Sequence, residues 1–326
     1  MQQDPHNTDV IANINYFPAT GIPIPKSEWK VKYLDDKDEY TRPMLIRDVR
    51  KADKTFDLDV NGFTFVTLPQ KQRVDRHSSE EDVKREYYPE LEEVVKKLYE
   101  PLPTSSITDI KISAHKTNTL RTGALTIHIF NHVIRAHTSP SSKGIQDAQG
   151  RWQDIPSGHP HVDYAGSASA LAGTLTELSL PPHINNLFTT STRYAFLNCW
   201  RPLKRVRRDP LAVCDANTVP ESDYQVRMRE FSRTGNRSEN YVLSCGGLEK
   251  KKKKKEGREM EEGMGKGHEW WYMSGMQPWE MVVFKGLDSK REDRGWRCPH
   301  TAFRVEGSEG EEARESIEAR VVAFWE

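Results

Sequence analysis

Two histidines and one aspartate that lie far apart in the chain can form a single metal site, and this requirement constrains the fold. His161 and Asp163 are separated by one residue, and His300 follows much later. Side chains on an extended segment alternate between its two sides, so His161 and Asp163 point the same way. A strand that brings His300 beside them would place two imidazoles and one carboxylate on one face of a metal ion. This facial triad, with its opposite face open, is the ligand set of non-haem Fe(II) oxygenases.

A short pattern near the C-terminal end fits the cosubstrate of such enzymes. Arg314 and Ser316 combine a planar, two-pronged cation with a hydroxyl, which suits the distal carboxylate of 2-oxoglutarate. Each element alone has an ordinary explanation: a surface loop for the His-x-Asp triplet, a packed or solvated side chain for His300, and a solvated strand edge for Arg314. The order His-x-Asp, His, Arg-x-Ser favours Fe(II) and 2-oxoglutarate as cofactors.

Two alternatives to this site stay open. His159 has the same parity as His161 and is a second candidate nitrogen ligand; we prefer His161 because the His-x-Asp spacing begins there. A zinc hydrolase can also use two histidines and one aspartate. In that case the downstream pair of Arg314 and Ser316 would be unexplained.

Composition excludes several classes of function. The chain has 326 residues, 29% of them charged, a formal net charge of zero and a mean hydropathy of −0.77. The neutral balance favours neither nucleic acid nor an anionic membrane, and no apolar run approaches the roughly 20 residues that cross a bilayer. The first residues lack a basic start and an apolar core, so we do not expect them to form a secretory signal. Four cysteines without Cys-x-x-Cys spacing indicate free thiols in a reducing, cytoplasmic location.

The pattern of the chain predicts a mainly β fold with flanking helices. A helix is expected from about residue 79 to 99, with Pro89 kinking or splitting it. Short strands then follow one another closely, which is typical of a sandwich or barrel. We expect a double-stranded β-helix (jelly roll), whose open mouth would hold the metal ligands. The predicted strands cover residues 63–67, 109–114, 125–134, 193–200, 211–214, 240–244, 269–273, 280–284 and 316–325.

We interpret the chain as a single oxygenase domain over residues 1–326. Residues 1–60 are expected to form an extended N-terminal arm, residues 60–157 a flanking helix and strands, and residues 158–326 the jelly-roll core. Residues 246–267 contain a run of six lysines among Glu, Gly and Met, so they can bury little apolar surface and are predicted to be a disordered insertion. A nucleic-acid-binding or nuclear import tract and a gene-model artefact are the alternatives for this segment.

Several ordered stretches between about residues 158 and 324 carry a resemblance to a known family: HVDY at 161–164, NCWRPL at 198–203, DPLAVCD at 209–215, HEWWY at 268–272, FKGLDS at 284–289, PHTAF at 299–303 and RESIEAR at 314–320. In this order they resemble a fungal and bacterial family of Fe(II)/2-oxoglutarate-type oxygenases. The family includes hydroxylase/desaturase proteins of the AsaB type, gibberellin desaturase-like proteins and the cephalosporin methoxylation component.

The resemblance implies roles for individual residues. It makes His161, Asp163 and His300 the iron ligands, and Arg314 with Ser316 the clamp for the distal carboxylate of 2-oxoglutarate. Arg201 and Arg320 are further candidates for a cosubstrate or substrate carboxylate. Glu318 shares a strand face with Arg320 and could neutralise it there instead.

The function implied by the residues and the resemblance is hydroxylation or desaturation of a small-molecule secondary metabolite. The expected partners are that substrate and molecular oxygen, with a homodimer left open, and neither a membrane nor nucleic acid is expected. The main rival is a non-catalytic jelly-roll partner subunit or an inactive paralogue, against which the intact ligand set argues.

Overall fold

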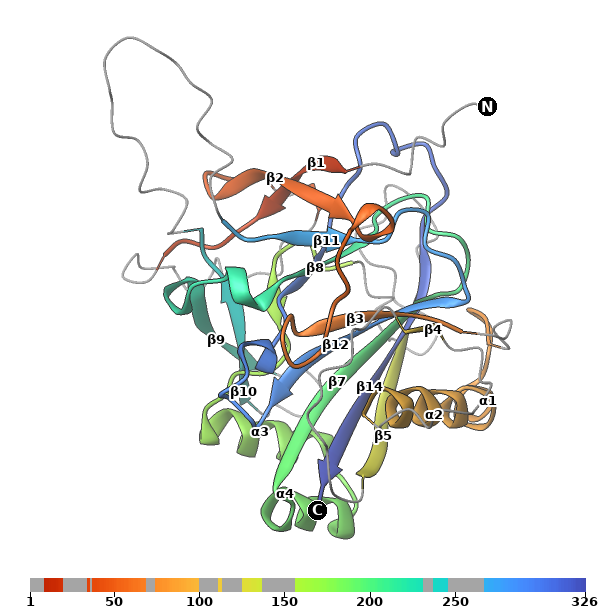
Figure 1. Cartoon of the computed structure of the whole chain (residues 1–326), viewed down its shortest axis with the longest axis vertical. Helices are drawn as coiled ribbons and strands as arrows, with labels where there is room; N and C mark the ends of the chain where they lie inside the picture. The colour runs from red at the N-terminus through yellow and green to blue at the C-terminus, as the bar shows by residue number, and fades with distance from the viewer. Residues whose placement is uncertain are drawn as a thin grey trace.

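Two sheets form the framework of the molecule (Figure 1). The structure is a computed structural model, and it describes residues 9–19, 34–35, 37–68, 74–99, 111–112, 125–136, 156–230, 237–245 and 267–326. The eight-stranded sheet has the order β1 (Val10–Asn15), β2 (Thr41–Asp48), β11 (Trp270–Tyr272), β8 (Leu211–Cys214), β13 (His300–Ala302), β6 (His161–Val162), β10 (Arg237–Leu243) and β9 (Tyr224–Glu230).

The six-stranded sheet contains the longest strands, and all of its strand pairs are antiparallel. Its order is β4 (Lys111–Ile112), β3 (Phe63–Thr67), β12 (Glu280–Asp288), β7 (Arg193–Pro202), β14 (Glu315–Trp325) and β5 (Leu125–Ala136). Its central strands are almost wholly buried. Apolar stretches within them, such as residues 281–284 and 321–325, made these strands predictable.

Apolar side chains fill the space between the two sheets. Phe284 and Trp200 of the six-stranded sheet pack with Val213 and Trp271 of the eight-stranded sheet in one buried cluster. Alternate residues of the same strands face outward, so Ile317 and other odd-numbered residues of β14 pack in a second cluster beneath a helix. The facing sheets agree with the predicted mainly β architecture.

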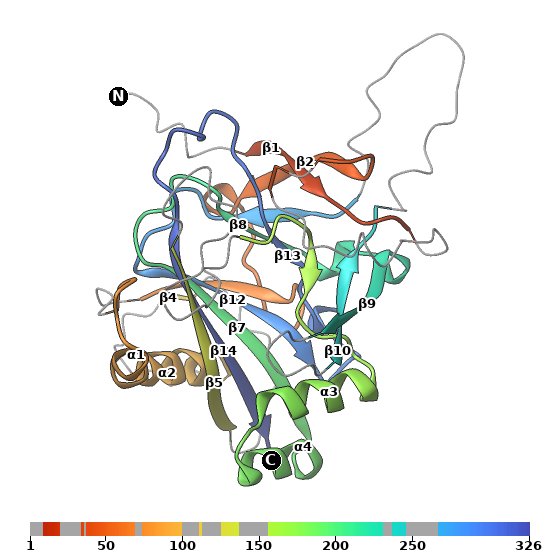
Figure 2. The ribbon, with the colours of Figure 1, turned by 180° about the vertical axis from the view of Figure 1, so that it is seen from behind.

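In the part of the chain that the structure describes, four α-helices flank the sheets (Figures 1 and 2). Helices α1 (Glu80–Glu86) and α2 (Tyr88–Tyr99) cover the outer face of the six-stranded sheet. Helices α3 (Ala168–Leu178) and α4 (Pro182–Thr190) lie at one end of its strands. The predicted helix is split, because α1 ends before Tyr87 and Pro89 stands in the first turn of α2, where its missing N–H costs nothing. The Ser79 side chain caps α1 by accepting from Asp82 N.

The segment predicted as an N-terminal arm contributes two strands to the eight-stranded sheet. β1 and β2 pair with each other, and β2 runs parallel to β11, with Ile14, Tyr16 and Ile46 buried. Residues 246–266 of the predicted insertion lie outside the described residues. None of the helices in the described ranges is long and apolar enough to cross a membrane.

Candidate functional site

The two predicted histidine ligands are brought together by strand pairing. β13 is antiparallel to β6, and His300 lies directly opposite His161 in register, so both side chains emerge on the same face of the sheet. Their ring centroids are 4.3 Å apart. Asp163 follows β6 immediately, and one ligand atom from each of His161, Asp163 and His300 lies within 4.8 Å of the others. Residues far apart in sequence thus form one cluster able to hold a metal ion.

Backbone carbonyl groups orient both imidazoles. Nδ1 of His161 is 2.9 Å from the carbonyl oxygen of His159, and Nδ1 of His300 is 3.3 Å from that of Cys298. A protonated Nδ1 that donates to a carbonyl leaves Nε2 with its lone pair available for a metal. His159 is engaged by other groups, since its Nδ1 lies 3.2 Å from Ser157 Oγ and its ring packs against the rings of Phe17 and His161, with centroids 5.3 and 5.1 Å away. His159 is not a member of the cluster.

The electrostatics of the cluster keep His161 and Asp163 in metal-binding forms. Burial, together with the nearby His300, lowers the pKa of His161 to about 4, so this imidazole is neutral near pH 7. Burial alone would raise the pKa of Asp163, but Arg320 and the two histidines outweigh it, and the pKa of this carboxyl is lowered from its ordinary value. A neutral imidazole and an ionised carboxylate are the forms that bind metals.

A buried amide fixes the orientation of Asp163. Nδ2 of Asn198, on β7, donates to Oδ2 of Asp163 at 2.7 Å, and Arg320 Nε lies 3.5 Å from the same oxygen. The other oxygen, Oδ1, lies 3.7 Å from His161 Nε2. One carboxylate oxygen is therefore held by the protein, and the other faces the histidine.

The six-stranded sheet supplies a charged wall opposite the histidines. Ser316, Glu318 and Arg320 are alternate residues of β14 and share the face that looks toward the eight-stranded sheet, where Glu318 and Arg320 line the cavity at the cluster. Glu318 forms an ion pair with Arg320 at 2.9 Å and accepts a hydrogen bond from Arg135 of β5 at 3.0 Å. The two guanidinium groups lower the pKa of Glu318 although burial opposes them. The contacts of Glu318 thus agree with the alternative in which it neutralises the charge of Arg320.

Arg314 and Ser316 keep unsatisfied polar atoms beside this wall. Arg314 is buried, and its Nη1 donates to the carbonyl of Asp209 at 2.8 Å while the guanidinium lies 5.3 Å from the ring of Trp200. Burial and the nearby Arg135 lower the pKa of Arg314 to about 10, which leaves it charged near neutrality. Within the described residues neither Arg314 Nε nor Ser316 Oγ has a hydrogen-bond partner, and buried polar groups without partners are costly.

Arg201 lies on the opposite face of β7 from the cluster. Its neighbour Trp200 lines the cavity, so strand alternation turns Arg201 toward α2. There it is fully buried, with Nη1 at 2.7 Å from Glu90 and its guanidinium near the Tyr87 ring. These contacts are those of a structural ion pair.

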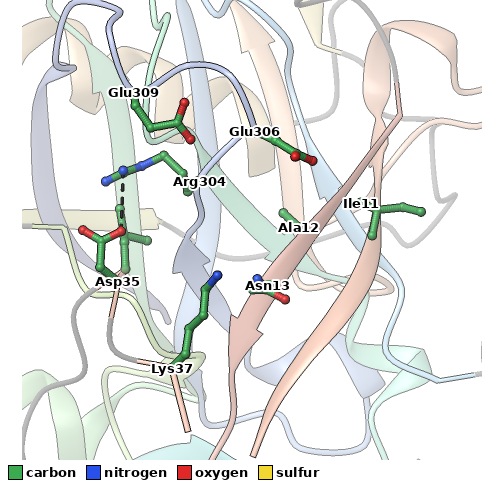
Figure 3. Close-up of a pocket in the computed structure, with 9 residues that line it drawn as sticks. Ile11, Ala12, Asn13, Asp35, Lys37, Arg304, Glu306 and Glu309 are labelled. Atoms are coloured by element: carbon green, nitrogen blue, oxygen red, sulfur yellow. Dashed lines mark ion pairs between the residues drawn. The ribbon is translucent and has the colours of Figure 1, made fainter.

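The cavity at the cluster is small, about 40 Å³. It is lined by Arg135, Ser157, His161, Asp163, Trp200, Leu211, His300, Thr301, Ala302, Arg314, Glu318 and Arg320. A larger hollow of about 490 Å³ is lined by β1 and by residues following β13, and Figure 3 shows its charged side chains. It shares no lining residue with the cluster, and it lacks the metal-binding set.

Three residues of the site were not identified from the sequence. Arg135 has no motif around it that marks it. Asn198 could have been found, because it stands two residues before Trp200 and therefore on the same face of a predicted strand. The contribution of Asp209 is made by a main-chain carbonyl, which residue type does not reveal.

Comparisons with known proteins agree with this geometry. A family model described as an oxidoreductase/YMDC permease-like domain matches residues 5–105 and 112–324. The hydroxylase/desaturase efuI of Hormonema carpetanum is 30% identical over 295 residues, which cover 88% of this chain and 84% of that protein. The alpha-ketoglutarate-dependent dioxygenase phiK, from a fungus, is 26% identical over 288 residues, covering 87% and 84% of the two chains.

Solved structures show the same fold. The iron and alpha-ketoglutarate-dependent endoperoxidase NvfI superposes with a TM-score of 0.62 over 98% of this chain and 99% of its own, at 19% sequence identity. This likeness confirms the predicted jelly roll, and the sequence relatives confirm the resemblance to hydroxylase/desaturase oxygenases.

Proposed function

Because the chain belongs to the oxidoreductase family that includes the hydroxylase/desaturase efuI, we propose that it is a non-haem Fe(II)/2-oxoglutarate-dependent oxygenase of a small organic molecule. The observation that carries this proposal is the meeting of His161, Asp163 and His300 within 4.8 Å. These three residues would hold Fe(II) on one face. Relatives named as a hydroxylase/desaturase and as an alpha-ketoglutarate-dependent dioxygenase support the same activity.

Arg314 and Ser316 would hold the distal carboxylate of 2-oxoglutarate. Their fit to a carboxylate rests on the buried Arg314 Nε and Ser316 Oγ, which have no hydrogen-bond partner among the described residues. An anion that accepts from both would satisfy these donors and form charge-assisted bonds with the guanidinium. Arg320 is a weaker candidate, because Glu318 already balances its charge.

When bound, iron and 2-oxoglutarate supply the oxidation of an unactivated C–H bond by O₂, with 2-oxoglutarate leaving as succinate and CO₂. The chain contributes position and charge. The Nδ1 contacts hold His161 and His300 with Nε2 available, Asn198 fixes Asp163, and Arg314 would orient the cosubstrate. The cavity at the cluster is lined both by the metal-ligand candidates and by Arg314, so a cosubstrate bound there would contact both.

The rival functions fit these observations less well. A non-catalytic jelly roll would have no need for two histidines held by backbone carbonyls with an ionised aspartate between them. A zinc hydrolase could use the same three ligands. It would leave the unsatisfied donors of Arg314 and Ser316 without a purpose.

The test of this function is conversion of 2-oxoglutarate into succinate. Protein supplied with Fe(II), ascorbate and O₂ is expected to form succinate, with a slow basal rate that a matching small molecule increases. A hydrolytic activity with Zn²⁺, together with no succinate under any of these conditions, would contradict the proposal. Screening candidate substrates by this stimulation would also narrow the substrate class.

Asn198→Leu should weaken Fe(II) binding without removing a ligand. Losing the 2.7 Å bond to Asp163 frees the carboxylate to rotate, and outer partners of this kind typically contribute about 10–100-fold in metal affinity. The control is Asn185→Leu on α4, whose side chain bonds only to the Leu180 carbonyl in the described structure. Competition with a chelating dye would measure both affinities, and an unchanged value for Asn198→Leu would show that Asp163 needs no such support.

Arg201→Met should leave the affinities for Fe(II) and 2-oxoglutarate unchanged and lower stability. Removing Arg201 leaves Glu90 unpaired, but Glu90 is 27% exposed, so we expect a loss of about 2 kcal/mol rather than the several kcal/mol of a fully buried pair. Urea unfolding and a 2-oxoglutarate titration together check this. A large loss of cosubstrate affinity in a folded variant would restore Arg201 as a cosubstrate ligand.

We also propose that the partners are a small-molecule substrate and O₂. A homodimer and a cytoplasmic location stay predictions from the sequence. The four cysteines are buried, and none of them is in a disulfide bond.

A further inference from the structure

The backbone has a left-handed conformation at Asp209. Only two non-glycine residues of the described ranges have a positive φ, Ser179 at 48° and Asp209 at 54°. Ser179 ends helix α3, where such a conformation is common. Asp209 ends no helix and precedes Pro210, and a residue before proline is normally extended. Unfavourable backbone conformations of this kind persist where the surrounding structure requires them, and they concentrate at functional sites.

The contacts of Asp209 connect the two halves of the site. Its main-chain carbonyl accepts from Arg314 Nη1 at 2.8 Å, just before β14. Its carboxylate Oδ1 accepts from Arg304 Nε at 2.5 Å, two residues beyond β13, which carries His300. Arg304 also pairs with Asp35, its Nη1 lying 3.5 Å from Asp35 Oδ1 (Figure 3). Asp209 thus joins the strand bearing a metal-ligand candidate to the start of the strand bearing Ser316.

We propose that Asp209 is a positioning residue that aims Arg314 at the distal carboxylate of 2-oxoglutarate, acting through its left-handed backbone. This inference rests on the proposed function. Arg314 is a long side chain with many rotamers, and the described structure gives its guanidinium one hydrogen bond, the bond to Asp209 O. Holding Nη1 there leaves Nε unpaired and buried. The carboxylate of Asp209 holds this turn of the chain through Arg304, whereas its main-chain carbonyl accepts the hydrogen bond that orients Arg314.

Substitutions that differ in backbone preference separate these two contributions. Asp209→Asn and Asp209→Gly keep a residue that tolerates positive φ, but both lose the charge that pairs with Arg304. Asp209→Val also loses that charge, and its β-branched side chain strongly disfavours positive φ. The readouts are the dissociation constants, with Fe(II) bound and without O₂, of 2-oxoglutarate and of 2-oxopentanoate, which has the same chain length but no distal carboxylate.

Asp209→Val is expected to weaken the binding of 2-oxoglutarate about tenfold or more, which is the effect of losing one hydrogen bond to a charged group. Its affinities for 2-oxopentanoate and Fe(II) should stay near those of the wild type, and Asp209→Asn and Asp209→Gly should keep the preference for 2-oxoglutarate. A merely structural role would weaken both oxo acids equally. If Asp209→Val does not fold, Asp209→Ala replaces it and is compared with Asp209→Gly. Asp209→Ala should then show the smaller preference for 2-oxoglutarate over 2-oxopentanoate.

Two results would overturn the inference alone: a preference for 2-oxoglutarate in Asp209→Val equal to that of the wild type, or an equal loss in the Asn, Gly and Val variants. An equal loss in all three variants would assign the effect to the carboxylate side chain of Asp209 and not to its backbone conformation. A wild-type protein that loads Fe(II) but does not distinguish 2-oxoglutarate from 2-oxopentanoate would overturn the proposed function as well.

Discussion

His300→Ala is expected to lower the affinity for Fe(II) by more than about 100-fold, beyond the range seen when only an outer partner of a metal ligand is lost. The reason is geometric. His300 lies opposite His161 across the β13–β6 pair, with the rings 4.3 Å apart, and no other residue of the described cluster can take its place. His161→Ala and Asp163→Ala should have effects of the same order. Dye competition under anaerobic conditions measures each affinity.

His159→Ala is the matched control for this result. His159 is a buried histidine on the same segment, but its ring is engaged with Ser157 and Phe17. We expect it to retain most of the iron affinity, because its main-chain carbonyl, which orients His161, remains in the alanine variant. Equal losses of iron in His159→Ala and His161→Ala would transfer the ligand role to His159.

Arg314→Gln is expected to lower the affinity for 2-oxoglutarate by about 100-fold, because two charge-assisted hydrogen bonds are lost at roughly 1.5 kcal/mol or more each. Arg314→Lys should recover little of this, since an ammonium cannot reproduce the planar fork. Iron affinity should be unchanged, because Arg314 does not contact the histidines. Titration of the iron-loaded variants with 2-oxoglutarate measures the loss.

Arg320→Gln distinguishes Arg314 from its rival. Arg320 is paired with Glu318 and also approaches Asp163, so its replacement should perturb the metal site more than the cosubstrate. A loss of 2-oxoglutarate affinity in Arg320→Gln larger than in Arg314→Gln would contradict the assignment of the clamp to Arg314.

The strands that carry the site could be predicted because strand alternation and burial leave a clear pattern. Residues 193–200, 211–214, 280–284 and 316–325 fall within β7, β8, β12 and β14. The pairing that sets His300 against His161 could be inferred only as a requirement, since the sequence does not contain the register of β13 on β6. Chemistry, rather than periodicity, indicated that these residues meet.

Strand β9 was not predicted, and its composition explains why. It is an edge strand that alternates charged or polar residues with Val226 and Met228, and these two apolar side chains are largely exposed. The usual pattern, with apolar residues inward and polar residues outward, is therefore absent. Edge strands often carry charged residues, which limit further pairing.

The candidate role of Arg201 illustrates a constraint that the sequence did contain. Trp200 and Arg201 are consecutive residues of one strand, so they face opposite sides of the sheet and cannot both line the same cavity. Asn198 and Trp200 are two residues apart on this strand, so they share one face of the sheet. Main-chain contributions, such as the carbonyl groups of His159, Cys298 and Asp209, depend on backbone placement and required the structure.

The iron centre is tested most directly by an anaerobic titration of the wild-type protein with Fe(II) in the presence of 2-oxoglutarate, followed in the visible spectrum. We expect a weak metal-to-ligand charge-transfer band that saturates at one iron per chain and is lost in His300→Ala. A folded protein that gives no such band at saturating Fe(II) and 2-oxoglutarate would contradict the claim that His161, Asp163 and His300 form an oxygenase iron centre.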